Sequence, residues 1–465
     1  AATYNITNLQ LNGLTVSAGN AAVSNGLTAA DLADDAFTNP TNGAIDVVYT
    51  VVPVTAGGCE GDAFTITVTV NPEPVVSDQT VGPVCSDQPL GVNFNASTSV
   101  AAATYNITNL ELNGLTVSAG NAIVTNGLTA ADLADDAFTN TTNAPVNVVY
   151  TLVPLTAGGC EGQAFTVTVT IDPEPVVDPQ TTTVCSDELV GLTLADDADG
   201  PSVVTYNLVA IAPESGLTSG AGNQTIQDGL LSNSIVNDTW ENLTSAALDV
   251  VYTFVPVGNN GCSGDAFTVT VRVDPEPVGV STTEDICSDV AFSFDPQDNI
   301  DDTVNGGNGA VSTFAWEVTA IIGSVTGVAI GDLGTGNVTG TLTNTSSTIV
   351  TVEYTITPTS APEGCEGDAF TITITVNPEP LVSDQTVGPV CSDQPLGVNF
   401  NASTSVAAAT YNITNLELNG LTVSAGNAIV TNGLTAADLA DDAFTNTTNA
   451  PVNVVYTLVP LTAGG

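Results

Sequence analysis

Hydrophobic and polar residues alternate strictly in short stretches that recur along the chain. Residues 64–70 read Phe-Thr-Ile-Thr-Val-Thr-Val, and close copies return at 165–171 and 370–376. A period of two places every second side chain on the same face of an extended strand, so that one face packs on a core. Asn-Gly pairs between such stretches, as at 12–13 and 25–26, predict tight hairpin turns. The pattern therefore predicts an all-β fold made of immunoglobulin-like, antiparallel β-sandwiches.

One stretch departs from this pattern. Residues 28–37 read TAADLADDAF, which favours a helix, and Thr28 is suited to cap its N-terminus. We expect one or two helical turns here, on a crossover between the two sheets of a sandwich.

The pattern repeats with a fixed period. Five tyrosines are spaced by 101 or 102 residues, and a large apolar residue lies 12 positions before each of them. Residues 76–159 are also identical to residues 382–465, which indicates recent duplication within an array of structural units. We expect these positions to anchor the cores of successive units: Phe37 with Tyr49, Phe138 with Tyr150, Trp240 with Tyr252, Leu342 with Tyr354, and Phe444 with Tyr456.

Each period ends in an Asn/Asp-Pro-Glu-Pro sequence. Two prolines fix their own backbone and hold the preceding residues extended, so these sequences predict semi-rigid joints between units. Units of about 100 residues are large enough to hold a core of their own. The chain then divides into five repeats, of which we expect the first and last to be incomplete: 1–74, 75–175, 176–277, 278–380 and 381–465.

Composition limits what the chain can bind or catalyse. Fifty acidic residues face one basic residue, Arg272, and the net charge is −49. Binding to nucleic acid or to an anionic membrane surface needs Lys and Arg, so both partners are excluded, and no apolar run is long enough to insert into a bilayer. The sequence has no histidine, the usual general base. These observations predict a protein that is not an enzyme.

Eight cysteines fall in pairs around the joints and allow two pairings. Across a joint, Cys59 would bond Cys85. Within a repeat, the last hairpin turn of an immunoglobulin-like sandwich lies at the same end as the start of the first strand, which favours the pairs Cys85–Cys160, Cys185–Cys262 and Cys287–Cys365. Cys59 and Cys391 would then pair with residues outside the sequence. Disulfides predict an oxidising, extracellular location.

Three motifs carry a resemblance to a known family. They are Cys85-Ser86-Asp87 and its copies, the Gly-Cys-Glu-Gly turn, and the Pro-Glu-Pro ending. In these the chain resembles the PKD-like and immunoglobulin-like tandem repeats of giant secreted cell-surface proteins of Bacteroidota, such as SprB-type gliding-motility adhesins. The resemblance implies a structural segment of a long surface filament or adhesin, which carries load or projects an adhesive tip.

Two alternatives remain open for the function. One is an array of carbohydrate-binding repeats that grips surface polysaccharide, and the other is an extender region of an adhesin stiffened by Ca²⁺. The partners expected from the sequence are neighbouring repeats of the same chain, surface polysaccharide and other filament chains.

Calcium is the one cofactor that the sequence suggests. If the assumed topology holds, carboxylates from the linker, from the motif beside the first cysteine and from the last hairpin turn gather at the N-terminal end of each repeat, and Ca²⁺ needs six to eight oxygen ligands. The candidate ligands are Glu73, Asp78, Asp87 and Glu161 in the second repeat, Glu174, Asp178, Asp187 and Asp265 in the third, and Glu276, Asp285, Asp289, Glu366 and Asp368 in the fourth. The alternative is that these charges face water.

Overall fold

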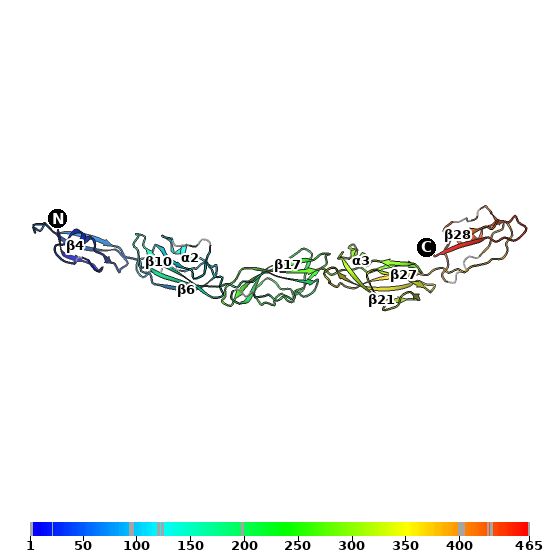
Figure 1. Cartoon of the computed structure of the whole chain (residues 1–465), viewed down its shortest axis with the longest axis horizontal. Helices are drawn as coiled ribbons and strands as arrows, with labels where there is room; N and C mark the ends of the chain where they lie inside the picture. The colour runs from blue at the N-terminus through cyan, green and yellow to red at the C-terminus, as the bar shows by residue number, and fades with distance from the viewer. Residues whose placement is uncertain are drawn as a thin grey trace.

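The structure is a computed structural model of the whole chain. It describes residues 3–20, 22–92, 97–118, 121, 125–196, 200–398, 405–425, 427 and 431–463. Figure 1 shows five units in one extended row, without any unit folding back on another. The described residues form five separate hydrophobic clusters, one in each unit. Among the described residues, no helix is long and apolar enough to span a bilayer.

Strands dominate every repeat, and the helices are single short turns. The first repeat contains β1 (Thr3–Gln10), β2 (Thr15–Val16), α1 (Ala29–Ala33), β3 (Phe37–Thr38), β4 (Ile45–Val54) and β5 (Phe64–Val70). The second contains β6 (Gln79–Cys85), β7 (Thr104–Glu111), β8 (Thr116–Val117), α2 (Ala130–Ala134), β9 (Phe138–Thr139), β10 (Val146–Leu155) and β11 (Phe165–Asp172). The third contains β12 (Gln180–Cys185), β13 (Val203–Pro213), β14 (Leu217–Ser219), β15 (Gln227–Leu230), β16 (Trp240–Asn242), β17 (Leu248–Gly258) and β18 (Phe267–Asp274).

The last two repeats follow the same plan. The fourth contains β19 (Thr282–Cys287), β20 (Ala291–Phe294), α3 (Gln297–Asp301), β21 (Ser312–Ile322), β22 (Val325–Thr326), β23 (Leu333–Thr335), β24 (Val338–Thr341), β25 (Thr343–Asn344), β26 (Val350–Ser360) and β27 (Phe370–Asn377). The fifth contains β28 (Thr410–Glu417), β29 (Thr422–Val423), α4 (Ala436–Ala440), β30 (Phe444–Thr445) and β31 (Val455–Leu461).

Each larger sheet has the same order of strands. In the third repeat the order is β12-β18-β17-β13-β15, and β14-β16 form a small second sheet. All pairs in these sheets are antiparallel except the pair formed by the first and the last long strand of the repeat. β12 runs parallel to β18, from Gln180 beside Val269 to Cys185 beside Asp274. The same parallel pair recurs as β6 with β11 and as β19 with β27.

The tyrosines and the apolar residues 12 positions before them pack together. Phe138, Tyr150, Trp240, Tyr252 and Leu342 are all buried. Tyr49, Tyr354 and Phe444 are buried as well, while Phe37 and Tyr456 are partly buried against the same clusters. Four of the five pairs meet edge to face, at ring centroid distances of 6.2 to 6.4 Å. This geometry is the favoured one for aromatic rings.

Each of these four tyrosines donates a hydrogen bond from its hydroxyl to a carboxylate. The Tyr252 hydroxyl donates to Asp238 at 2.8 Å and accepts a hydrogen bond from the Trp240 indole N–H at 2.8 Å. The hydroxyls of Tyr49 and Tyr150 donate to Asp35 and Asp136 at 2.6 Å. Burial, followed by the charge and the hydrogen bond of Asp238, raises the pKa of Tyr252, so its hydroxyl keeps its proton and remains the donor.

The predicted helix is confirmed. α1 begins after Thr28, whose side chain accepts from the backbone of Asp31, while the Asp31 carboxylate accepts from the backbone of Thr28. This is a capping box. Equivalent boxes precede α2 and α4, at Thr129 and Thr435.

Tyr252→Phe is expected to lower the free energy of unfolding of the third repeat by about 1–3 kcal/mol. The change leaves one oxygen of the buried Asp238 carboxylate and the buried Trp240 indole N–H without their hydrogen bonds to the hydroxyl. Urea denaturation followed by tryptophan fluorescence measures the change. Tyr354→Phe is the matched control, since Tyr354 packs on the Trp316 ring and no hydrogen bond joins its hydroxyl to a carboxylate in the described part of the chain. Equal effects of the two substitutions would contradict this account.

Candidate functional site

The joints between repeats bring together a disulfide, hydrogen bonds and close backbone contacts, and they are the candidate functional site. Two disulfides cross them: Cys85 of the second repeat bonds Cys262 of the third, and Cys185 of the third bonds Cys365 of the fourth. Each pair has its Cα atoms 5.6 Å apart. The third repeat is therefore bonded twice to each of its two neighbours, by the backbone of the joint and by a disulfide.

The Cys-Ser-Asp motif holds the first of these cysteines at the far end of its repeat. Cys85 is the last residue of β6 and lies beside Asp172, the last residue of β11. The next two residues form a turn in which Ser86 N–H donates to Asp172 O and Ser86 Oγ accepts from Asn140 N–H. Asp87 adopts a left-handed backbone with φ of 59°, which Asp tolerates better than most residues. Cys85 is thereby presented at the joint that follows β11.

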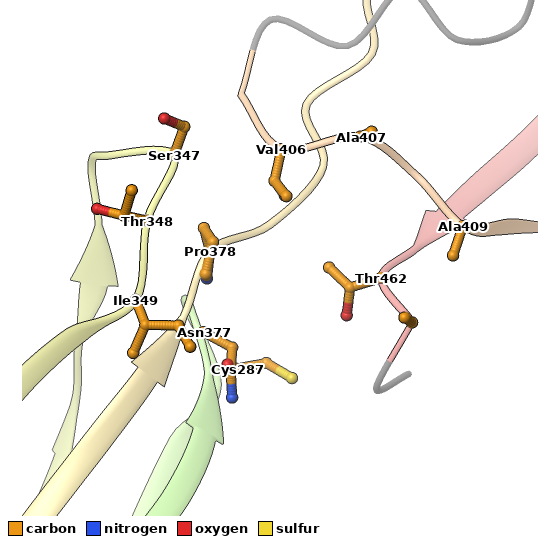
Figure 2. A pocket seen from close by; sticks show the side chains of 11 residues that line it. Cys287, Ser347, Thr348, Ile349, Asn377, Pro378, Val406, Ala407, Ala409 and Thr462 are labelled. Carbon is orange, nitrogen blue, oxygen red and sulfur yellow. The ribbon is translucent and has the colours of Figure 1, made fainter.

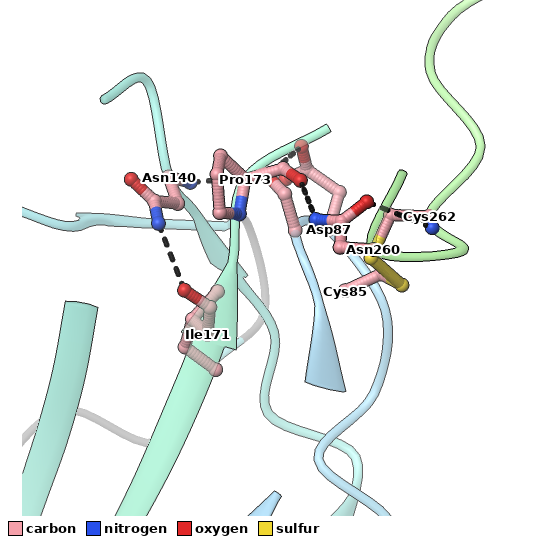
Figure 3. The surroundings of a disulfide bond; sticks show 8 residues. Cys85, Asp87, Asn140, Ile171, Pro173, Asn260 and Cys262 are labelled. Carbon is pink, nitrogen blue, oxygen red and sulfur yellow. Dashed lines mark hydrogen bonds between the residues drawn. A yellow bond between two sulfur atoms is a disulfide. The ribbon is translucent and has the colours of Figure 1, made fainter. Parts of the chain in front are cut away.

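The Gly-Cys turn holds the second cysteine at the near end of the next repeat. Cys262 lies in the turn between β17 and β18 and is 1% exposed. Figure 3 shows that Asn260 in this turn donates from its side chain to the carbonyl of Pro173 at 2.8 Å and accepts from the backbone of Cys262. The turn is therefore tied to the joint by a hydrogen bond as well as by the disulfide.

A glycine in the same turn permits the close approach to the joint. A Cβ atom on Gly264 would lie 1.9 Å from the carbonyl oxygen of Pro175, the last residue of the joint. Gly162 and Gly367 approach Pro74 and Pro277 in the same way, at 2.0 Å. Because every other residue carries a Cβ, only glycine fits here without moving the joint.

A loop of the following repeat clamps each joint from another side. The Asn308 side chain donates to the carbonyl of Glu276 at 2.7 Å and to the carbonyl of Thr244, in the preceding repeat, at 3.3 Å. Ser99 and Ser405 donate to the carbonyls of Glu73 and Glu379. In the remaining joint, the Gly200 N–H donates to the Asn143 side chain of the preceding repeat at 3.0 Å.

The predicted disulfides within repeats are wrong. Cys85 and Cys185 bond to the next repeat, and so Cys85–Cys160, Cys185–Cys262 and Cys287–Cys365 do not form. The Gly-Cys turn does lie at the near end of its repeat, as predicted, but the other cysteine follows the end of the first strand and not its start. A strand of six or seven residues separates the two ends by about 20 Å, far beyond the reach of a disulfide. Pairing of Cys59 and Cys391 outside the sequence stays a prediction.

Because the Cys-Ser-Asp motif lies at the far end of its repeat, the predicted calcium ligands do not lie together as expected. Asp87, Asp187 and Asp289 lie at the far ends of their repeats, away from the other acids with which they were grouped. Asp78 accepts a hydrogen bond from the backbone of Thr166. The remaining candidates Glu73, Glu161, Asp178, Asp265, Asp285, Glu366 and Asp368 are exposed. Across the described residues, no three acidic or cysteine side chains are close enough to hold a metal ion. The predicted calcium clusters are therefore not assembled.

Carboxylates do approach one another at the joints, in a different grouping. Burial, followed by the charges of Asp87 and Asp265, raises the pKa of Glu174 to about 7. Glu276 in the next joint also has its pKa raised to about 7, by burial and then by the charges of Asp187, Asp368 and Glu188. Glu174 and Glu276 thus both lie near acids of the repeat before and of the repeat after their joint.

Acidification from pH 8 to pH 5 is expected to stabilise these joints. Because the pKa of Glu276 is higher in the folded chain than its ordinary value of 4.5, the folded state takes up the proton first as the pH falls through 7, and the free energy of unfolding rises. Glu276→Gln should therefore raise the melting temperature at pH 8 and have little effect at pH 5. Glu366→Gln, at an exposed position in the neighbouring turn, is the control. An equal gain at both pH values would contradict the assignment.

A cleft of about 710 Å³ lies at the joint between the fourth and fifth repeats. Figure 2 shows Cys287, Ile349 and Pro378 on one side of it and Val406 and Thr462 on the other. None of the residues that line it is charged. Such a lining offers no acid, base or metal ligand apart from the thiol of Cys287, so the cleft does not resemble a catalytic site.

The repeats match a known family of domains. The description of the PKD-like domain matches residues 8–74, 82–175, 182–277 and 284–380, about three quarters of the chain. The chain belongs to the PKD-like domain family.

Several solved structures are similar to parts of the chain at low identity and low TM-score. The I67–I69 fragment of the titin I-band is 12% identical, covering 66% of this chain and 96% of the fragment, with a TM-score of 0.26. Drosophila N-cadherin EC1–4 is 11% identical, covering 81% of this chain and 92% of its own, with a TM-score of 0.18. The FN1–FN3 domains of chicken CNTN1 are 10% identical, covering 64% and 100%, with a TM-score of 0.23. No match was found among curated proteins.

Sequence reasoning missed the residues that clamp the PKD-like repeats together. Ser99 and Ser405 are copies of one position, but the same role falls to Asn308 in the fourth repeat, so the period gives no signal there. Gly162, Gly264 and Gly367 do recur at a fixed position after the cysteine. Their recurrence beside a proline joint was a usable signal, because a strictly repeated glycine indicates a close backbone approach.

Proposed function

We propose that this chain of PKD-like repeats is a stiff, extended spacer within a secreted cell-surface filament of the adhesin type, which carries load or holds an adhesive tip away from the cell. The observation that carries the proposal is the construction of the joints. Each joint from the second to the fourth repeat combines a disulfide, a proline pair, a glycine contact and a side-chain clamp. A flexible tether would instead be rich in glycine and serine.

The chemistry of the chain supports a structural and non-catalytic role. The sequence has no histidine, and no charged residue lines the cleft at Cys287, so this cleft offers none of the usual general acids or bases. Disulfides between repeats favour an extracellular location, and the net charge of −49 keeps neighbouring filaments apart at short range. Membership of the giant surface proteins of gliding bacteria is part of this proposal and rests on the motif resemblance.

A carbohydrate-binding array has less support. Sugar sites usually present exposed aromatic side chains, but Trp240 is buried and bonded to Tyr252. Trp316 is covered on one side, where Gly334 approaches its ring so closely that a Cβ would lie 2.0 Å from it. A glycan array probed with the chain is therefore expected to give no signal.

Small-angle X-ray scattering tests the stiffness of the spacer. If the joints set the shape, the maximum dimension of the chain should be the same at 0.02 M and 0.5 M NaCl, although the higher concentration screens charges beyond a few Å. A chain extended only by repulsion among its carboxylates would shorten at high salt, and that result would contradict the proposal.

Labelling of cells tests the location. Antibodies against residues 75–380 should bind intact cells of the source organism, with the label held away from the envelope. Label that appears only after the cells are permeabilised would refute the surface role.

A further inference from the structure

We propose that the disulfides divide the array into two interleaved covalent tracks that take tension, while the greater part of each repeat is shielded from it. This inference rests on the proposed role as a spacer under load. It concerns which residues transmit the force, and nothing in the sequence motifs assigns such a path.

The track segments are short and alike. Each begins at the cysteine of a Gly-Cys turn and ends at the cysteine of the next Cys-Ser-Asp motif, 25 or 26 residues later: 160–185, 262–287 and 365–391. Each contains the last strand of one repeat, the proline joint and the start of the next repeat. In 160–185 these are β11, the joint and β12, and in 262–287 they are β18, the joint and β19.

The disulfides connect alternate segments. Cys185 ends the segment 160–185 and bonds Cys365, which begins the segment 365–391. In the same way Cys85, at the end of β6, bonds Cys262, which begins the segment 262–287. The two bonds bridge sequence separations of 177 and 180 residues. A covalent path along the rod therefore passes through one segment for every two repeats and omits the residues between its cysteines.

The two tracks lie side by side in every complete repeat. In the third repeat β12 belongs to one track and β18 to the other, and they are neighbours in parallel register. In the fourth repeat the same holds for β19 and β27. Tension along the rod pulls both strands in the same direction, so it does not shear one past the other. The parallel pair, unusual in an otherwise antiparallel sheet, is explained by this arrangement.

The tracks have almost no slack. A segment of 25 residues reaches at most about 90 Å when fully extended, and strands are already close to that limit. By contrast, the backbone from Cys85 to Cys287 is 202 residues long and reaches about 700 Å. With the disulfide closed, the shortest covalent path between Cys85 and Cys287 runs through Cys262 and the segment 262–287. Unfolding of the hydrophobic cores cannot lengthen the rod between these points, because most core residues lie outside this path.

Single-molecule force spectroscopy measures this directly on the whole chain. Handles are attached through bio-orthogonal side chains at Gln88 and Val290, two exposed positions just beyond the cysteines. With Cys85 bonded to Cys262, the path between the handles has three residues from Gln88 back to Cys85 and 28 from Cys262 to Val290, a maximum of about 110 Å. In the variant with both Cys85→Ser and Cys262→Ser, the remaining Cys185–Cys365 bond leaves a path of 97 residues from Gln88 to Cys185 and 75 from Cys365 back to Val290. This variant should therefore extend to about 600 Å, more than fivefold further.

Each outcome is distinct. Disulfides within repeats would give a path of 56 residues, about 200 Å, and that extension would overturn the proposal. So would an oxidised chain that extends as far as the double variant. Adding reductant to the oxidised chain during the measurement should release the long extension and does not depend on how the variant folds. Cys160→Ser is the control and should leave the short extension unchanged, since Cys160 takes no part in either bond. The salt experiment on stiffness can fail independently of these results.

Discussion

Replacing both Cys85 and Cys262 by serine should destabilise the second and third repeats together and loosen the joint between them. The bond closes a loop of 177 residues, and on the chain-entropy model its loss costs about 5 kcal/mol, among the largest effects of any local change to this chain. Urea denaturation measures the loss of stability, and small-angle scattering should show a wider range of shapes. The hydrogen bond from Asn260 to Pro173 and the Gly264 contact remain, so the joint should loosen without separating.

The control for this change is Cys59→Ser, because Cys59 is exposed and is not bonded in the structure. It should leave both stability and scattering unchanged. If the double variant unfolds at the same urea concentration as the unaltered chain, the disulfide does not join the two repeats in the way described.

Gly264→Ala should displace the joint. The added Cβ would lie 1.9 Å from the carbonyl oxygen of Pro175, and neither group can rotate away because both belong to the backbone. Overpacking of this kind typically costs about 1–3 kcal/mol. The shift should also strain the neighbouring Cys262, so that a smaller fraction of the chain forms the disulfide to Cys85, measured by thiol titration of the purified protein.

Gly61→Ala is the matched control, at the same position of the turn in the first repeat. The nearest atom to its Cβ would be a side-chain carbon of Pro53 at 3.1 Å, with no joint proline in contact. A small effect at Gly61 and a large effect at Gly264 assign the cost to the joint. Similar losses at both positions would mean that the glycine serves the turn and not the joint.

The fold could be predicted because its determinants are local or periodic. Alternation at 165–171 predicts β11, and the structure buries Phe165, Val167 and Ile171 on one face. The helix after Thr28 was predictable from its cap, which involves residues only three apart. Residues that recur 12 positions before each tyrosine indicated a shared core position, even where Leu342 replaces an aromatic residue.

The joint could not be predicted in the same way, because its contacts depend on which end of a strand a residue occupies. The sequence places Cys85 near the first strand of its repeat, but only the parallel pairing of β6 with β11 shows that it lies at the far end. The prediction placed Cys85 and its copies at the wrong end of the first strand. The three predicted disulfides therefore had the wrong partners, and the acids around Glu174 and Glu276 were grouped wrongly. The clamps at Ser99 and Asn308 join residues of different type in different repeats, so no period marks them.

The repeats and their joints contribute different properties to the rod. Aromatic pairs with a buried carboxylate, such as Trp240, Tyr252 and Asp238, stabilise each sandwich separately. The joints fix one sandwich relative to the next and place two parallel strands along the axis. With a single arginine and no lysine in the chain, trypsin-like proteases find almost no place to cut it.

Peptide mapping of the unreduced protein tests most directly the claim that neighbouring repeats are bonded across their joints. Digestion with pepsin at low pH, which suppresses disulfide exchange, should release one pair of peptides that links Cys85 to Cys262 and another that links Cys185 to Cys365. Mass spectrometry identifies both. Peptides that link Cys85 to Cys160 and Cys185 to Cys262 would show that each bond closes a single repeat, and would contradict the account.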